Sequence, residues 1–123
     1  MKMSEWFTAL DIEVRAVLGR ADANIAFSVD GDGERREYSS SGSNVTVAKY
    51  NDHRVFIDGI VASPDPSWDE KIGGERRLFR APHHNRVFEI DAAGIEYAAD
   101  VIRAWLSHDM KAIEKIRNSA HSA

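Results

Sequence analysis

The spacing of hydrophobic residues predicts a helix near the N-terminus. Across residues 5–18 apolar side chains recur at helical spacing, which places them on one stripe: Phe7, Leu10, Val14, Val17 and Leu18. Ser4 precedes the stripe as an N-cap residue, and Gly19 follows it as a stop signal. We expect this helix to carry Asp11 and Arg15 as an ion pair on its outer face.

From residue 24 onward the hydrophobic period falls to two, which is typical of strands with one buried face. The alternation predicts strands over 24–29, 34–40, 45–50 and 54–61, with a turn at 30–33. The strand over 34–40 is rich in charge, so we expect it at an edge of the sheet. There it would either discourage pairing with other chains or accept a partner strand.

The clearest predicted hairpin joins residues 45–50 to residues 54–61. A three-residue loop would set Tyr50 opposite Arg54 and would keep Lys49 from facing the same arginine. This register also groups four β-branched residues on one face of the sheet: Val45, Val47, Val55 and Ile57. We expect these two strands to be central.

A second hairpin is predicted within residues 71–91, with strands over 75–81 and 86–90. Pro82 would begin its turn, and His83 and His84 would continue it as solvated turn residues. The hairpin would then lead directly into the strongest helix of the chain.

That helix is expected to begin after Asp91, an N-cap residue. Its apolar stripe is continuous: Ile95, Ala98, Ala99, Ile102, Trp105 and Leu106. Residues 107–109 interrupt the pattern, which resumes at Met110, so the C-terminal helix is expected to be broken or bent and to fray from residue 118. The sequence therefore predicts an α+β fold: an N-terminal helix, a mostly antiparallel sheet of about six short strands, and a C-terminal helical segment on the same sheet face.

The composition is that of an ordinary globular domain. The chain has 123 residues, of which 43% are hydrophobic and 29% charged, so we expect one domain with one core. It has no cysteine, which excludes disulfides and thiolate metal sites. No apolar run is long enough for a signal peptide or a membrane span. We expect a cytoplasmic protein with no membrane contact and no cofactor.

Positive charge is concentrated in one stretch. The formal net charge is −4, yet residues 71–86 contain five cations and one acid. This stretch overlaps the end of the longest irregular segment, 62–74, in which Trp68 is the one large apolar residue with an aromatic ring. Tryptophan and arginine are enriched among the residues that dominate protein interfaces. We therefore expect a partner protein to bind the 62–86 region through these residues: Trp68, Arg76, Arg80, His83, His84 and Arg86.

The leading hypothesis is thus a small non-catalytic interaction module of the inhibitor, adaptor or chaperone type. Nucleic-acid binding through the same hairpin is a second hypothesis, with Phe79, His83 or Tyr38 available for stacking. Self-association through a sheet edge is compatible with either hypothesis.

A small enzyme that uses one histidine and one carboxylate is a third hypothesis. Its candidate groups are His53, His83 and His84 with Asp52, Asp58 or Asp91. No nucleophile elbow, zinc-binding helix or phosphate-binding glycine loop accompanies them. We therefore expect no catalytic residues and no metal site.

Overall fold

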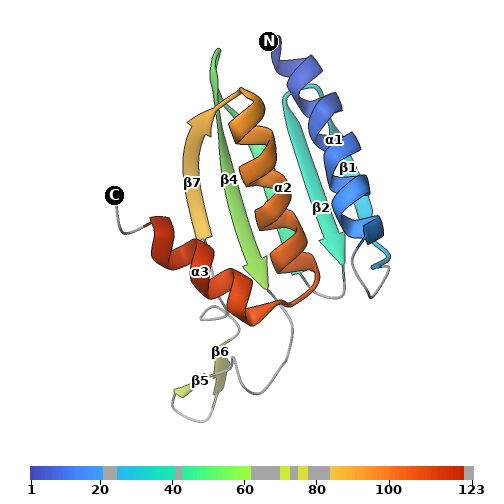
Figure 1. The fold of residues 1–123 in the computed structure, drawn as a ribbon. Coiled ribbons are helices and arrows are strands. Elements are labelled where there is room, and N and C mark those ends of the chain that lie inside the picture. The colour runs from blue at the N-terminus through green and yellow to red at the C-terminus, as the bar shows by residue number, and fades with distance from the viewer. Residues whose placement is uncertain (21–24, 41–42, 62–69, 73–74, 78–83, 121–123) are drawn as a thin grey trace.

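A computed structural model describes residues 1–20, 25–40, 43–61, 70–72, 75–77 and 84–120 of the chain. In these residues a helix, α1 (Met3–Arg20), precedes an antiparallel sheet, and two helices follow it, α2 (Ala92–Leu106) and α3 (Met110–Ala120) (Figure 1). This confirms the predicted α+β class. It also confirms that the C-terminal helical segment is divided in two, although α3 extends into the segment predicted to fray.

The main sheet has five strands where about six were predicted. In spatial order they are β1 (Ser28–Asp32), β2 (Arg35–Ser40), β3 (Ser43–Asn51), β4 (Arg54–Val61) and β7 (His84–Glu89). Every neighbouring pair is antiparallel. Two short strands, β5 (Glu70–Ile72) and β6 (Glu75–Arg77), pair with each other in a separate two-stranded sheet.

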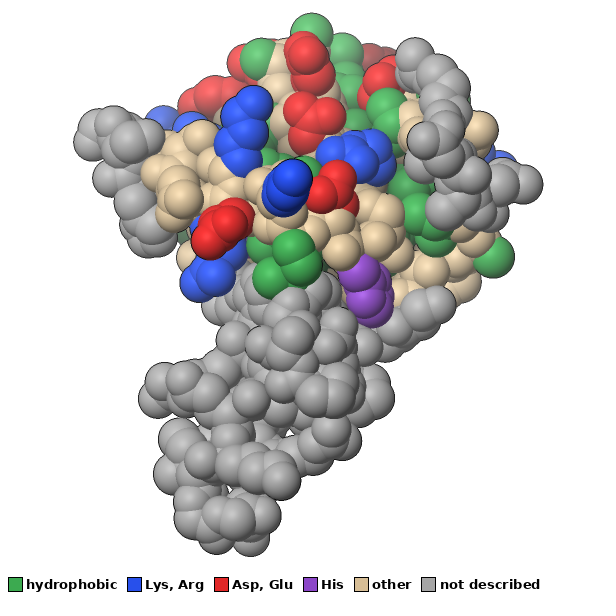
Figure 2. Space-filling model, turned by 60° about the horizontal axis from the view of Figure 1, so that its bottom comes forward, with side chains coloured by type: hydrophobic (Ala, Val, Ile, Leu, Met, Phe, Trp, Pro, Cys, Tyr) green, Lys and Arg blue, Asp and Glu red, His purple; other side chains and the backbone are tan. Residues whose placement is uncertain are grey.

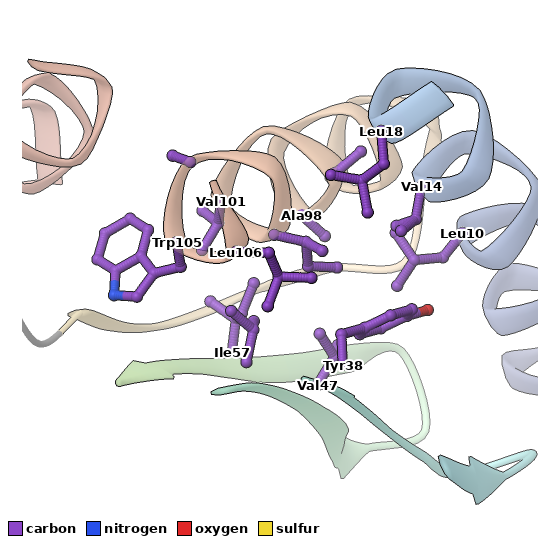
Figure 3. Close-up of a cluster of buried hydrophobic side chains, with 14 of the residues drawn as sticks. Leu10, Val14, Leu18, Tyr38, Val47, Ile57, Ala98, Val101, Trp105 and Leu106 are labelled. Atoms are coloured by element: carbon purple, nitrogen blue, oxygen red, sulfur yellow. The ribbon is translucent and has the colours of Figure 1, made fainter. Parts of the chain in front are cut away.

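The helices α1 and α2 lie side by side on one face of the sheet and enclose the core between themselves and the strands (Figure 1). Figure 3 shows Leu10, Val14 and Leu18 of α1 directed toward the side chains of α2 and toward Tyr38 on the sheet. The alternating residues Val45, Val47, Val55 and Ile57 are fully buried, as the hairpin pattern predicted. Hydrophobic burial on this one face is the main stabilising contribution to the fold.

The α1 helix is fixed to its surroundings by polar contacts as well. Its Trp6 indole N–H donates to the backbone carbonyl of Asp91 at 3.0 Å, which joins α1 to the start of α2. The prediction that Asp11 lies on the outer face of the helix is wrong. Its carboxylate instead faces the sheet, where it accepts from the Tyr38 hydroxyl at 2.5 Å and pairs with Arg36 at 3.1 Å. The helical stripe was correct, but the strand beneath it supplies cationic and phenolic partners that sequence spacing does not reveal.

The α2 helix begins and ends as predicted. Asp91 is the N-cap, and its side chain accepts from the backbone N–H of Gly94 at 2.7 Å. At the other end Ser107 is the C-cap and His108 adopts a left-handed φ of 54°. Asp109 then accepts from the backbone N–H of Ala112 at 3.2 Å, which begins α3.

The first two strands differ from the prediction. β1 starts at Ser28 and continues to Asp32, and the turn falls at 33–34 instead of 30–33. β2 is paired on both sides, by β1 and β3, so it is not an edge strand. Its charged residues were misleading because Arg36 is neutralised by Asp11 under a helix.

In the β3–β4 hairpin the predicted register is confirmed along the body, where Val47 faces Ile57 and Lys49 faces Val55. The tip differs, because a bulge at Tyr50 makes Asn51 the partner of Arg54.

The second predicted hairpin is wrong. β6 pairs with β5, and β7 pairs with β4 across a long connection. This pairing sets Phe88 opposite Val55 and extends the helix-covered face of the sheet to Phe88, which packs against the core. The burial of a shared apolar face therefore favours the pairing of β7 with β4 over a local pairing of β7 with β6.

Candidate functional site

The structure describes the side chains of only part of the predicted partner-binding set. Trp68, Arg80 and His83 lie outside the described residues, and Arg76 lies in β6, where the backbone alone is described. His84 and Arg86 are both in β7, two positions apart, so their side chains point to the same, helix-covered side of the sheet. These two residues mark the part of the molecule where the candidate site is built.

His84 is a structural residue and not a solvated turn residue. Its side chain is 5% exposed, and its Nε2 atom hydrogen-bonds with the hydroxyl of Tyr97 in α2. The imidazole also stacks on the indole of Trp105, with 5.6 Å between ring centroids and 34° between planes. These contacts hold the first residue of β7 against Tyr97 and Trp105 of α2.

Arg86 lies two residues after His84, on the exposed part of β7. Its guanidinium carbon is 4.9 Å from the centroid of the Tyr97 ring, within the range of a cation–π contact. Burial raises the pKa of the Tyr97 phenol, and the neighbouring Arg86 lowers it in part. The phenol therefore stays protonated at neutral pH, and it presents its ring face to the arginine.

A hollow of about 420 Å³ opens next to Arg86, between β7, α2 and α3. Three cations line it, Arg86, Arg103 and Lys115, together with one acid, Asp100. Its other main lining residues are apolar or aromatic: Tyr97, Val101, Ala112 and Ile116. We call this space the helix-side hollow. A second hollow of about 340 Å³ continues on the same side toward Phe88 and the start of α2.

The opposite face of the sheet carries no described helix and has a hollow of its own beside β7. This open-face hollow has a volume of about 340 Å³, and it is lined by Tyr50, Phe56, Asp58, Asn85, Arg86 and Val87. Tyr50 is 61% exposed and Val87 is 41% exposed. The bulge in β3 places the phenol here, so this feature depends on a register detail that was not predicted.

β7 is therefore an edge strand with a hollow on each face of the sheet. Among the described strands only β4 pairs with it, so β7 and β1 are the two edges of the main sheet. Arg86 lines each of these three hollows. The sequence analysis did not identify Tyr97, Arg103 and Lys115 as site residues. The one available signal was that all three lie outside the apolar stripes of their helices, so the core does not account for them.

The charge pattern near α3 is mixed. Figure 2 brings the end of the molecule where α3 lies toward the viewer, and on its described part Lys and Arg side chains lie next to Asp and Glu side chains.

Tyr38, a stacking candidate for nucleic acid, is fully buried, so the prediction that it could stack on a base is wrong.

Two of the candidate histidines, His53 and His84, lie far apart along β4. His53 lies in the turn before Arg54, whereas His84 pairs with Gly59 at the far end of β4. At a rise of about 3.4 Å per residue, roughly 20 Å separates His53 from Gly59, the partner of His84. In the described ranges no group of three or more His, Asp or Glu side chains is placed to hold a metal ion.

One serine and one histidine do meet. The Ser43 hydroxyl lies 2.6 Å from Nε2 of His108, a spacing that also suits nucleophilic catalysis. Ser43 is 2% exposed, however, so its hydroxyl is closed to a substrate. The pair instead fastens the turn between α2 and α3 to the first residue of β3.

Comparisons with known proteins give no further assignment. No protein-family model, no curated protein sequence and no solved structure matches this chain. No helix in the described ranges is long and apolar enough to cross a membrane.

Proposed function

We propose that this protein is a non-catalytic interaction module that binds an extended segment of a partner protein along β7. The observation that supports the proposal is the pair of hollows on the two faces of the sheet, which meet at one strand edge. The proposal keeps the class of function predicted from the sequence. It moves the binding surface from the 62–86 region to β7 and its neighbours on α2 and α3.

The chemistry of a strand edge suits this function. An edge strand presents backbone N–H and C=O groups on its outer side, and an extended peptide can satisfy them by joining the sheet. Successive peptide side chains then point to opposite faces of the sheet. A hollow on each face can receive alternate side chains, so backbone hydrogen bonds supply affinity and the hollows supply specificity.

The two sheet edges are not equivalent. Both edges carry charge: β1 has the exposed carboxylates of Asp30 and Asp32, whereas β7 has Arg86 and Glu89, and Glu89 is paired with Arg54 at 2.9 Å. β7 has six residues and carries Val87 on the open face beside the exposed Tyr50. A segment of about six residues would cover β7 from end to end.

A random dodecapeptide library displayed on phage would test this proposal, with the full chain as bait. Selected peptides should bind Val87→Lys at least about tenfold more weakly than the unchanged protein, since a lysine there would block the open-face hollow. Ser28→Lys places the same side chain on the exposed β1 edge and should leave binding unchanged.

Backbone amide shifts would locate the peptide. The largest changes should fall on residues 84–89, with hydrogen-exchange protection of amides in β7. Selected peptides that bind Val87→Lys and the unchanged protein equally, or that shift amides elsewhere only, would refute strand addition at β7.

A further inference from the structure

We propose that the segment bound along β7 carries a carboxylate side chain opposite Arg86, flanked on each side by an apolar residue. This inference rests on the proposed strand addition and names the chemistry of the partner. It concerns an acidic segment of another protein, read by Arg86 and Lys115 on one face of the sheet and by Tyr50 and Val87 on the other.

The order of side chains follows from strand geometry. A residue added opposite Arg86 points to the same side of the sheet as Arg86, which is the helix side. Its two neighbours lie opposite Asn85 and Val87 and point to the open face. The central residue therefore enters the helix-side hollow, and the flanking residues enter the open-face hollow.

The charges of the helix-side hollow favour an anion. Three cations line it against the single carboxylate of Asp100. Arg103 already pairs with Asp109 at 3.3 Å. Within the described residues no carboxylate forms an ion pair with Arg86 or Lys115, whereas Arg35, Arg36 and Arg54 each have one. The positive charge of Arg86 and Lys115 is thus available to a ligand.

The position of Arg86 also suits recognition of a carboxylate. The guanidinium rests over the Tyr97 ring, which restricts its motion, and a planar guanidinium can form two parallel hydrogen bonds with a carboxylate. Tyr97 is itself held by the buried His84. Because this support is formed before binding, less side-chain entropy is lost when the ligand arrives.

The open-face hollow favours apolar neighbours. Tyr50, Phe56 and Val87 supply its hydrophobic surface, and Asp58 supplies its one carboxylate. An acidic residue on this side would therefore meet a like charge, and an aliphatic or aromatic residue would bury apolar area. The two faces together select for alternation of apolar, acidic and apolar residues.

The test uses the selected dodecapeptides as synthetic, N-acetylated and C-terminally amidated probes. Aligned sequences should share one Asp or Glu with an apolar residue on each side. Replacing that acid with its amide should weaken binding about tenfold, the size expected for a charge-assisted hydrogen bond. The preference for the acid over its amide should shrink as the salt concentration rises.

Arg86→Gln should remove the preference for acid over amide while the amide peptide still binds. Arg35→Gln, which changes an exposed arginine on the open side of β2, should leave the preference intact. Peptides with a free C-terminus distinguish the source of the carboxylate. If only the terminal carboxylate matters, recognition of an acidic side chain is refuted.

The two proposals fail in different ways. Selected peptides that lack a shared acid, or that keep their acid preference in Arg86→Gln, would overturn the acidic motif. If those peptides still lose affinity in Val87→Lys, strand addition at β7 stands and the acidic motif alone is wrong. If Val87→Lys has no effect, the proposed function fails first.

Discussion

The indole of Trp105 lies directly on Gly59, so closely that a Cβ atom at position 59 would come within 3.0 Å of Nε1 and Cε2 of the ring. Gly59 is the cross-strand partner of His84, which stacks on the same indole. Because Gly59 has no side chain, Trp105 of α2 can pack on β4 and contact His84 of the edge strand β7. Through His84 and Tyr97 this contact also positions Arg86.

Gly59→Ala should destabilise the protein by about 1–3 kcal/mol, because the added methyl group would displace a fully buried indole. The free energy of unfolding in urea measures the effect. Gly19→Ala is the matched control, since no atom lies within 4 Å of a Cβ at that position of α1. The control should be neutral or slightly stabilising. An unchanged midpoint in Gly59→Ala would show that Trp105 does not pack as described.

Tyr38 should make the protein sensitive to alkaline pH. Burial raises the pKa of its phenol above the ordinary value of 10, and the hydrogen bond to Asp11 raises it further. Between pH 10 and 12 the unfolded chain therefore loses a proton that the folded chain keeps. The stabilisation is complete below about pH 10 and is lost above it, at up to about 1.4 kcal/mol per pH unit for each such tyrosine.

Tyr38→Phe should therefore flatten the fall in unfolding free energy above pH 10, as measured by urea titrations at several pH values. Tyr97, whose pKa is also raised, would keep part of the slope. Tyr50→Phe removes a phenol that is 61% exposed and should leave the slope as it is. An equal slope in Tyr38→Phe and the unchanged protein would contradict the buried bond to Asp11.

Asp91→Ala should cost about 1 kcal/mol of stability, the usual loss for an N-cap that satisfies a first-turn N–H. Its carboxylate accepts from Gly94 at 2.7 Å. Asp52→Ala makes the same change where the carboxylate is 98% exposed, and there the free energy of unfolding should barely move. Equal effects in the two variants would argue against the cap.

Much of the local structure could be predicted because its causes lie within a few residues. The Asp91 cap, the break at 107–109 and the pairing of Val47 with Ile57 all follow from capping chemistry or from side-chain periodicity. The charged strand β2 shows where such reasoning failed. A run of charge predicts exposure only if no partner covers it, and Asp11 of α1 covers Arg36.

The candidate site was predictable only in part. His84 and Arg86 stood out because they lie two positions apart in a stretch rich in positive charge, but their roles differ. One is buried against Trp105 and the other is exposed over Tyr97. Burial depends on which elements pack above a strand, and no local pattern contains that information.

By itself, then, the sequence determined the helices, the alternation of the strands and the α+β class, because periodicity and capping act over short distances along the chain. Only the tertiary structure decided that β7 joins β4, that Gly59 admits Trp105, and that Arg86 meets Lys115 of α3 at one hollow. Those contacts join residues far apart in the chain, and the burial of a shared apolar face selects them over nearer alternatives.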